Sequence, residues 1–194
     1  PNGLKPVGTR GAANWNQVVN MYLLDSGDTT ATFVGDLVRI AGNAGVAGQT
    51  VNGIDCEGMP TIQQSAAGDV HIGVIVGLLP LQTNLEAKHR VASTSRIALV
   101  SDDPHTVYEI QEVSGGTALT SAAVGLNANV VVGSGNTTTG ASGMELDNST
   151  EATTAALDVH ILGLVKRPDN AFGEHAKYLV MISDHSFNIA QVGQ

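Results

Sequence analysis

The sequence predicts an all-β protein: a β-barrel or β-sandwich-like domain with long polar loops and an extended N-terminal arm. Two observations on composition favour this class. Of the 194 residues, 23 are Gly, whereas charged residues make up only 14% and aromatic residues 4%. Abundant small and β-branched residues with few Lys or Glu favour strands joined by turns over long exposed helices. The third observation is that no segment shows a sustained helical period with caps.

The first 32 residues differ from the rest of the chain. They contain two prolines, four glycines and the only Trp, and only Val18–Leu24 has the character of a strand. We therefore expect residues 1–32 to form an extended N-terminal arm and residues 33–194 to form the β-rich domain. Trp15 and Tyr22 would then be anchors on a neighbouring surface. The alternative is that both side chains fold back onto the protein's own barrel.

Short runs of β-branched and apolar residues follow the arm. Thr106–Val113 alternates between two faces, as a half-buried strand does. Only Leu85–Val91 is a candidate for a turn or two of helix. The predicted strands are Phe33–Ala41, Val70–Leu79, Arg96–Ser101, Thr106–Val113, Asn129–Val132, Ala156–Val165 and Tyr178–Ser183.

Two segments of the β-rich domain resemble each other. Residues 69–103 and 158–185 both open with Asp-Val-His-Ile, continue through a Pro-containing connection, and end in an apolar run that leads into Ser-Asp. This pattern predicts a duplicated strand–loop–strand unit with His71 and His160 in matching places. Chance similarity between short β segments is the alternative.

Two long segments have no strand pattern. Gly42–Ala67 is rich in Gly, Ala and Gln, and Gly133–Thr154 is polar and of low complexity. Loops of this length in a compact domain are usually functional or mobile. We interpret both as surface or intersubunit loops.

Charge excludes several classes of partner. Eighteen Asp and Glu against nine Lys and Arg give a formal net charge of −9. Binding of nucleic acid needs clustered cations, and so does binding to an anionic membrane, so we expect neither partner. Cys56 is the only cysteine, which excludes an intrachain disulfide and a thiolate metal cluster. The apolar runs are too short to span a bilayer, and no signal peptide precedes Pro1, which favours synthesis in the cytoplasm.

No motif for catalysis, cofactor binding or metal binding stands out. Gly-x-Ser-x-Gly, the phosphate-binding GxxxxGK[ST] and HExxH are all absent from the sequence. His71 and His160 invite a metal hypothesis, but alternation along a strand favours hydrogen-bonded histidines at a sheet face. We predict no enzyme activity, no cofactor and no metal.

Several stretches together resemble the head decoration, or cement, proteins of tailed bacteriophages. The resemblance covers nearly the whole chain and consists of strand and turn segments rather than reactive residues. The stretches are PNGLKPV at residues 1–7, DTTATFVGDLVRIAG at 28–42, IGVIVGLLP at 72–80, ASTSRIALVSDDPHTVYEIQE at 92–112, VGLNANVVVGSGNTTTGASGMELD at 124–147 and ILGLVKRPDN at 161–170.

The resemblance implies a structural virion protein that binds the outside of an assembled head. Its partner would be the major capsid protein, with neighbouring capsomers cemented together, and it would form a homo-oligomer, a trimer being favoured. Lys5, Arg10, Trp15 and Tyr22 on the arm are the candidate interface residues, with the aromatic side chains as the anchors.

Two other functions remain open at this stage. The polar loops around residues 133–154 would suit a host-glycan-binding or tail-associated module of the same virion. A metal-dependent hydrolase using His71 and His160 is a third hypothesis. Copy number per particle separates the first two, because a cement protein is present in hundreds of copies and a tail component in a handful.

Overall fold

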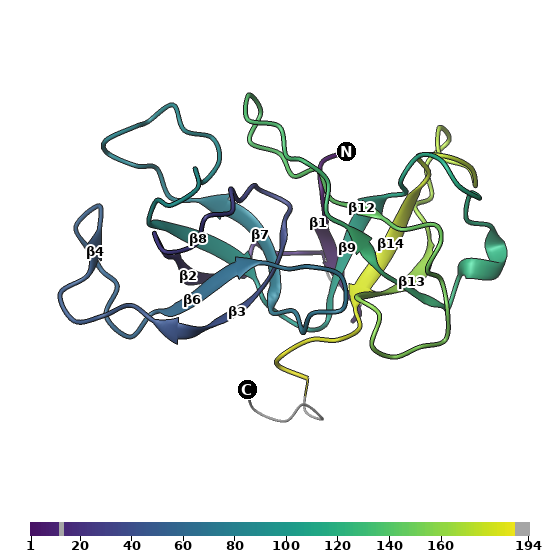
Figure 1. Cartoon of the computed structure of the whole chain (residues 1–194). Helices are drawn as coiled ribbons and strands as arrows, with labels where there is room; N and C mark the ends of the chain where they lie inside the picture. The colour runs from purple at the N-terminus through teal and green to yellow at the C-terminus, as the bar shows by residue number, and fades with distance from the viewer. Residues whose placement is uncertain (12–13, 189–194) are drawn as a thin grey trace.

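The computed structural model describes residues 1–11 and 14–188, and the protein is all-β (Figure 1). One short 3₁₀ turn, η1, covers Ser121–Ala123. The strands are β1 (Lys5–Thr9), β2 (Asn20–Leu24), β3 (Leu37–Ala44), β4 (Thr50–Val51), β5 (Ile54–Asp55), β6 (Pro60–Gln64), β7 (Gly73–Leu78), β8 (Arg96–Ser101), β9 (Thr106–Gln111), β10 (Asn127–Ala128), β11 (Val130–Val131), β12 (Glu145–Leu146), β13 (Val159–Leu164) and β14 (Lys177–Ile182).

Strands β2 to β8 build a closed barrel, with β4 and β5 forming a separate small hairpin. The order around the barrel is β2-β6-β3-β7-β8, in which β2 runs parallel to β6 and the other neighbours are antiparallel. Alternation along these strands sends apolar side chains inward, as at Leu24, Ile62 and Val100, which are all buried. We call this unit the first barrel.

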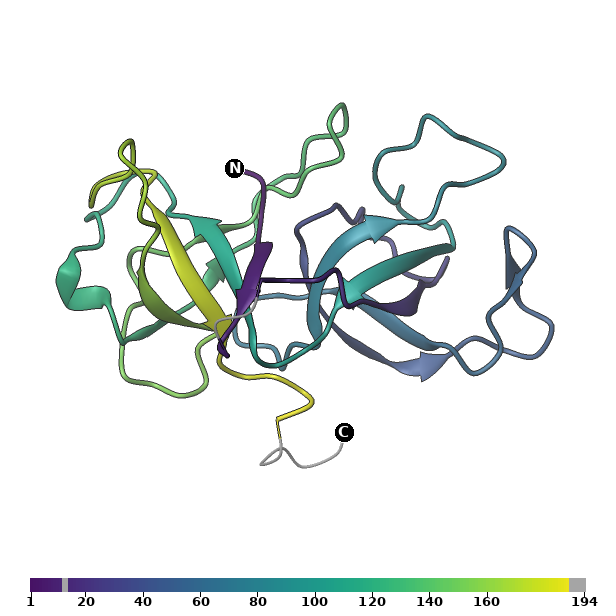
Figure 2. The same cartoon turned by 180° about the vertical axis from the view of Figure 1, so that it is seen from behind.

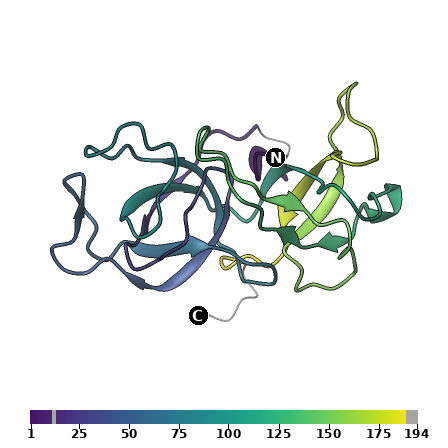
Figure 3. The ribbon, with the colours of Figure 1, turned by 45° about the horizontal axis from the view of Figure 1, so that its top comes forward.

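The strands in the second half of the chain are arranged in the same order around a second unit, but the strands that would close this unit are shorter. Its main sheet has the order β1-β9-β14-β13-β10, and β11 pairs with β12. A parallel bridge from Glu112 to Leu146 brings β12 back beside the end of β9. Thus β9, β10–β11, β12, β13 and β14 correspond to β2, β3, β6, β7 and β8. We call this unit the second barrel, and Figure 3 shows the two side by side.

The hydrogen bonds of the two barrels match residue by residue. Gly35 donates its N–H to the Ile75 carbonyl at 2.8 Å, and the Asp36 carbonyl accepts the Ile75 N–H in return. In the second barrel Gly125 donates to the Ile161 carbonyl at 2.8 Å. Both glycines have a positive φ, +96° and +89°, which favours a residue without a Cβ. The two barrels are therefore structural repeats of one another.

This register corrects the alignment predicted from sequence. Residues 69–103 and 158–185 do include the antiparallel hairpins β7–β8 and β13–β14, each with a register shift after its Ile. However, Ile75 is equivalent to Ile161, so the matching segments are Ile75–Leu79 and Ile161–Val165. The Asp-Val-His-Ile pattern is offset by three residues, and His71 and His160 are not equivalent positions.

Two strands within the first 32 residues, β1 and β2, are built into the barrels, whereas residues 15–19 between them are irregular and mostly exposed. β1 pairs with β9 on the edge of the second barrel, and β2 is a strand of the first barrel (Figure 2). The chain returns at its other end, where His185 forms a parallel bridge with His71 of the first barrel. An extended arm over residues 1–32 is therefore not found. Burial of apolar residues on both faces of the junction, such as Leu4 at 2% exposure, explains why the segment packs inward.

The other differences from the predicted elements lie in segments with little periodicity. Gly42–Ala67, expected to be a loop, contains β4, β5 and β6, and Leu85–Val91 is a series of turns. Gly133–Thr154 is irregular as expected, except for the two residues of β12. Part of this segment contacts the first barrel, because Val34 donates to the Gly140 carbonyl and accepts from the Ser142 N–H.

Candidate functional site

A buried chain of polar side chains joins the two barrels. His71 Nδ1 lies 3.0 Å from Ser65 Oγ, and His71 Nε2 lies 3.1 Å from Asp158 Oδ1. The Asp158 carboxylate also accepts the N–H groups of Gly68 and Val130 at 2.7 and 2.8 Å. A carboxylate acceptor requires the proton on Nε2, so Nδ1 accepts from the Ser65 hydroxyl.

This Ser–His–Asp order is also the order of a hydrolase triad, but the three side chains are sealed. Ser65 is 3% exposed, His71 0% and Asp158 1%. A nucleophile must reach its substrate, and the Ser65 hydroxyl has no such access in this structure. The chain of hydrogen bonds thus holds β7, β13 and the adjoining turns together, and we describe it as the inter-barrel tie.

The two histidines of the metal hypothesis have different partners. His160 Nδ1 lies 2.7 Å from Asn127 Oδ1, on the strand beside it, whereas His71 belongs to the inter-barrel tie. Among residues 1–11 and 14–188, no group of three or more His, Cys, Asp or Glu side chains is placed to hold a metal ion.

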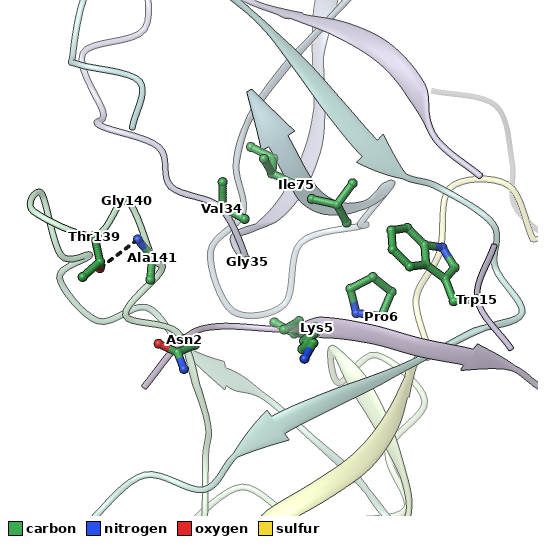
Figure 4. Close-up of a pocket in the computed structure, with 12 residues that line it drawn as sticks. Asn2, Lys5, Pro6, Trp15, Val34, Gly35, Ile75, Thr139, Gly140 and Ala141 are labelled. Atoms are coloured by element: carbon green, nitrogen blue, oxygen red, sulfur yellow. Dashed lines mark hydrogen bonds between the residues drawn. The ribbon is translucent and has the colours of Figure 1, made fainter. Parts of the chain in front are cut away.

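An apolar crevice of about 460 Å³ lies at the junction of the two barrels. Figure 4 shows β1 along one side of it, with Pro6 and Trp15 near one end and Thr139 to Ala141 near the other. Trp15 is half-buried, and its indole N–H is buried without a hydrogen-bond partner among residues 1–11 and 14–188. The residues that line the crevice are Asn2, Leu4, Lys5, Pro6, Trp15, Val34, Gly35, Ile75, Val76, Thr139, Gly140 and Ala141.

A smaller cationic depression of about 150 Å³ shares part of this lining. Its cations are Lys5, Arg167 and Lys177, and Asn2 and Lys5 also line the apolar crevice. Glu109 Oε1 forms ion pairs with Arg167 at 2.9 Å and with Lys177 at 3.4 Å. Lys5 is exposed and has no ion-pair partner among the described residues. The depression therefore carries more positive than negative charge.

The four predicted interface residues lie in different parts of the structure. Lys5 and Trp15 line the crevice, and Arg10 is exposed in the turn after β1, where its N–H bonds the His105 carbonyl. Tyr22 is only 5% exposed, and its hydroxyl donates to Asp102 Oδ2 at 2.7 Å. Burial raises the pKa of Tyr22, and the Asp102 charge adds to that rise. Tyr22 is thus an interior residue of the first barrel and not a surface anchor.

Sequence reasoning missed most of this surface. Val34, Ile75, Ala141, Arg167 and Lys177 come from separate segments, and only the pairing of β1 with the second barrel assembles them. A local signal existed only for Lys5 and Trp15, because they lie in a stretch of unusual composition.

The comparisons with known proteins add no relative. No protein-family model, no curated protein and no solved structure matches this chain. Within the described parts of the chain, no helix has the length and apolar character needed to cross a bilayer.

Proposed function

We propose that this protein is a structural, non-enzymatic component of a tailed-bacteriophage virion. It binds the outside of the assembled head through the major capsid protein and cements neighbouring capsomers, as a homo-oligomer for which a trimer is favoured. The observation that carries the proposal is the surface at the barrel junction, where an apolar crevice and a cationic depression adjoin each other.

Three features support a role in binding. The crevice offers Trp15 and Pro6 as rigid apolar contacts, and Trp is among the residues that contribute most to protein interfaces. Much of the lining belongs to β1, β7 and the bonded segments at Val34 and Gly140, so these parts lose little conformational entropy when a partner binds. A net charge of −9 disfavours contact with packaged DNA and suits the outer surface of a head.

The test is co-sedimentation of the purified protein with expanded heads that lack it, counting the copies bound per head. We expect saturable binding at hundreds of copies. Saturation at a handful would indicate a tail-associated or host-binding component instead, and no binding would reject the proposal.

Deletion of residues 1–24 is unsuited to locating the contact, because it removes β1 and β2 and with them a strand of each barrel. Single substitutions at Trp15 leave both strands in place. Trp15→Ala should weaken binding to heads, and Phe187→Ala, which truncates an aromatic side chain that is 53% exposed, is the matched control.

A further inference from the structure

The distribution of cations on this acidic protein is uneven. The chain has nine Lys and Arg, of which Arg90 and Arg96 are buried. Three of the remaining seven, Lys5, Arg167 and Lys177, line one depression of about 150 Å³. They come from β1, the β13–β14 connection and β14, so the clustering is a product of the fold and not of a basic run in the sequence.

The protein supplies only part of the negative charge that these cations need. Glu109, directly opposite Lys5 in the β1–β9 register, is ion-paired with Arg167 and Lys177. Glu145 lies nearby and is bonded to Gln111 at 3.1 Å, but it forms no ion pair with the three cations. An incoming carboxylate would therefore meet an uncompensated positive charge at Lys5.

The cationic depression and the apolar crevice adjoin at residues 2–6. Asn2 and Lys5 line both, so the two sites meet along residues 2–6, which we call the ridge; Figure 4 shows its crevice side. A ligand that fills both sites must offer an apolar group and an anionic group within a few residues of each other. An extended chain advances about 3.3 Å per residue, so neighbouring side chains can lie on either side of such a ridge.

We propose that the ridge at residues 2–6 seats a protein segment in which an apolar side chain adjoins an Asp or Glu. The apolar side chain enters the crevice against Pro6 and Trp15, and the carboxylate enters the depression beside Lys5 and Lys177. In identifying this segment as part of the capsid protein, the inference rests on the proposed function. A second copy of this chain is disfavoured as the occupant of this site, because it would bring a further net charge of −9, and the proposed homo-oligomer then forms through another surface.

The test uses two doubly substituted variants that lose the same total charge. Lys5→Gln with Lys177→Gln removes two cations from the depression and leaves the Arg167–Glu109 pair intact. Lys88→Gln with Lys166→Gln removes two exposed cations from elsewhere. At low salt we expect the first variant to bind heads about tenfold more weakly than the second, with the difference shrinking as salt screens the charges. Equal binding of the two variants would overturn the inference while leaving the proposed function standing.

A substitution series at the crevice tests the apolar half. Trp15→Ala should weaken head binding about tenfold, and Trp15→Phe should restore most of it, because a ring is again present. Each variant is first shown to keep the wild-type urea midpoint. Wild-type affinity in a folded Trp15→Ala protein would contradict the inference. The Lys5→Gln, Lys177→Gln variant could instead change the sedimentation of the free protein while its binding to heads stays unaltered. That result would identify a second copy of this chain as the occupant and would also overturn the inference.

The site can also be tested without heads, so the inference remains testable even if the proposed function is rejected. Trp15 is the only Trp, so its fluorescence reports on the crevice. The probes are the acetylated dipeptide amides Phe–Glu and Phe–Gln at millimolar concentration. A saturable response that is stronger for Phe–Glu, and that loses this preference in the Lys5→Gln, Lys177→Gln variant, supports the inference without any head. No response, or equal responses to both probes, rejects it.

Discussion

The first barrel closes through long strands, whereas the second closes through two-residue strands and single bridges. β3 is eight residues long and pairs with both β6 and β7, while its counterpart is divided into β10 and β11. The difference extends to the interior. Leu24, opposite Ile62 in the first barrel, corresponds to Glu112, opposite Leu146 in the second, and both are 0% exposed.

The same arrangement of strands around a barrel can therefore be stabilised in two ways, by apolar burial between continuous strands and by buried hydrogen bonds to irregular segments. Apolar side chains from continuous strands fill the first barrel, and their burial is the main stabilising contribution. The second barrel also has an apolar interior, but there the buried Glu112 carboxylate additionally bonds the irregular segments at Leu119 and Asn148.

The first prediction concerns Arg90, which orders the loops of the first barrel. Its guanidinium is 0% exposed and donates to the carbonyls of Asp25, Asp28, Thr30 and Thr94 and to the Asp28 carboxylate. Arg90→Met removes all five hydrogen bonds, including the ion pair to Asp28, although the Asp25 and Asp28 carbonyls keep bonds from the N–H groups of Asp28 and Ser93. We expect a loss of about 3–5 kcal/mol in the free energy of unfolding.

Urea denaturation of the Arg90 variant measures this loss. Lys88→Met, at an exposed position two residues away, is the control and should lie within about 0.5 kcal/mol of wild type. A loss below 1 kcal/mol in Arg90→Met would show that the loops of the first barrel are held by something other than this guanidinium.

The second prediction uses the equivalent glycines. At Gly35 an added Cβ would lie 2.4 Å from the Asn2 carbonyl oxygen, whereas at Gly125 it would meet nothing within 4 Å. Both substitutions to Ala place a side chain at positive φ, which costs about 1–2 kcal/mol. Gly35→Ala must also displace the backbone at the junction, so we expect a total of about 3 kcal/mol.

Because the two positions share their turn, Gly125→Ala is the built-in control for Gly35→Ala. Thermal or urea unfolding of both variants gives the difference directly. Equal losses would mean that the junction between Asn2 and Gly35 yields freely, and that the barrels are packed together less tightly than the structure indicates.

The third prediction exchanges the interior residue of one barrel for that of the other. Glu112 Oε1 accepts the Leu119 N–H at 2.8 Å and the Asn148 amide at 3.3 Å. Glu112→Leu introduces the residue found at Leu24 and leaves the Leu119 N–H buried and unpaired, whereas the Asn148 amide keeps its bonds to the Val113 and Gly115 carbonyls. We expect a cost of about 2–3 kcal/mol. Glu112→Gln retains an acceptor oxygen and should cost about 1 kcal/mol less, as measured by urea denaturation. A neutral or stabilising effect of Glu112→Leu would contradict a polar closure of the second barrel.

The same contrast explains how far the sequence predicts the fold. The all-β class and strands with continuous apolar runs, such as β7 and β8, follow from local periodicity. β1 could not be recognised, because Lys5–Thr9 contains Pro and Gly and becomes a strand only by pairing with β9. β11 lies within the predicted strand Asn129–Val132, whereas β10 and β12 are two residues each and have no periodicity to detect.

The candidate surface was predictable only where it coincided with unusual composition. Lys5 and Trp15 lay in the segment singled out from sequence, and both line the crevice. Arg167 and Lys177 gave no signal, since a cation after or within a strand is ordinary. For Tyr22 the sequence left two possibilities open, a surface anchor or a residue folded back onto the protein's own barrel. The pairing of Asn20–Leu24 with β8 buries its side chain, which agrees with the second.

The last prediction concerns pH and the contact by which the second barrel returns to the first. Burial lowers the pKa of His185 to about 4, with His71 also lowering it and Asp102 and Asp103 opposing the change. The imidazole Nε2 is buried without a hydrogen-bond partner, and Nδ1 accepts the Phe187 N–H. The unfolded chain binds a proton near pH 6.5, before the folded protein does, so protonation favours unfolding.

The stability that neutral His185 contributes is therefore complete above pH 6.5 and is lost as the pH falls toward 4. From pH 7 to 4.5 we expect a loss of about 2 kcal/mol, measured as the shift in unfolding free energy in urea. His185→Gln cannot take up this proton and should show a flatter dependence, while His175→Gln, at an exposed site, should keep the wild-type slope. Because His185 bridges to His71 across the barrel junction, a second unfolding transition appearing only at low pH would show that its protonation uncouples the two barrels. A single transition with the slope of His185→Gln unchanged from wild type would place the acid sensitivity elsewhere in the molecule.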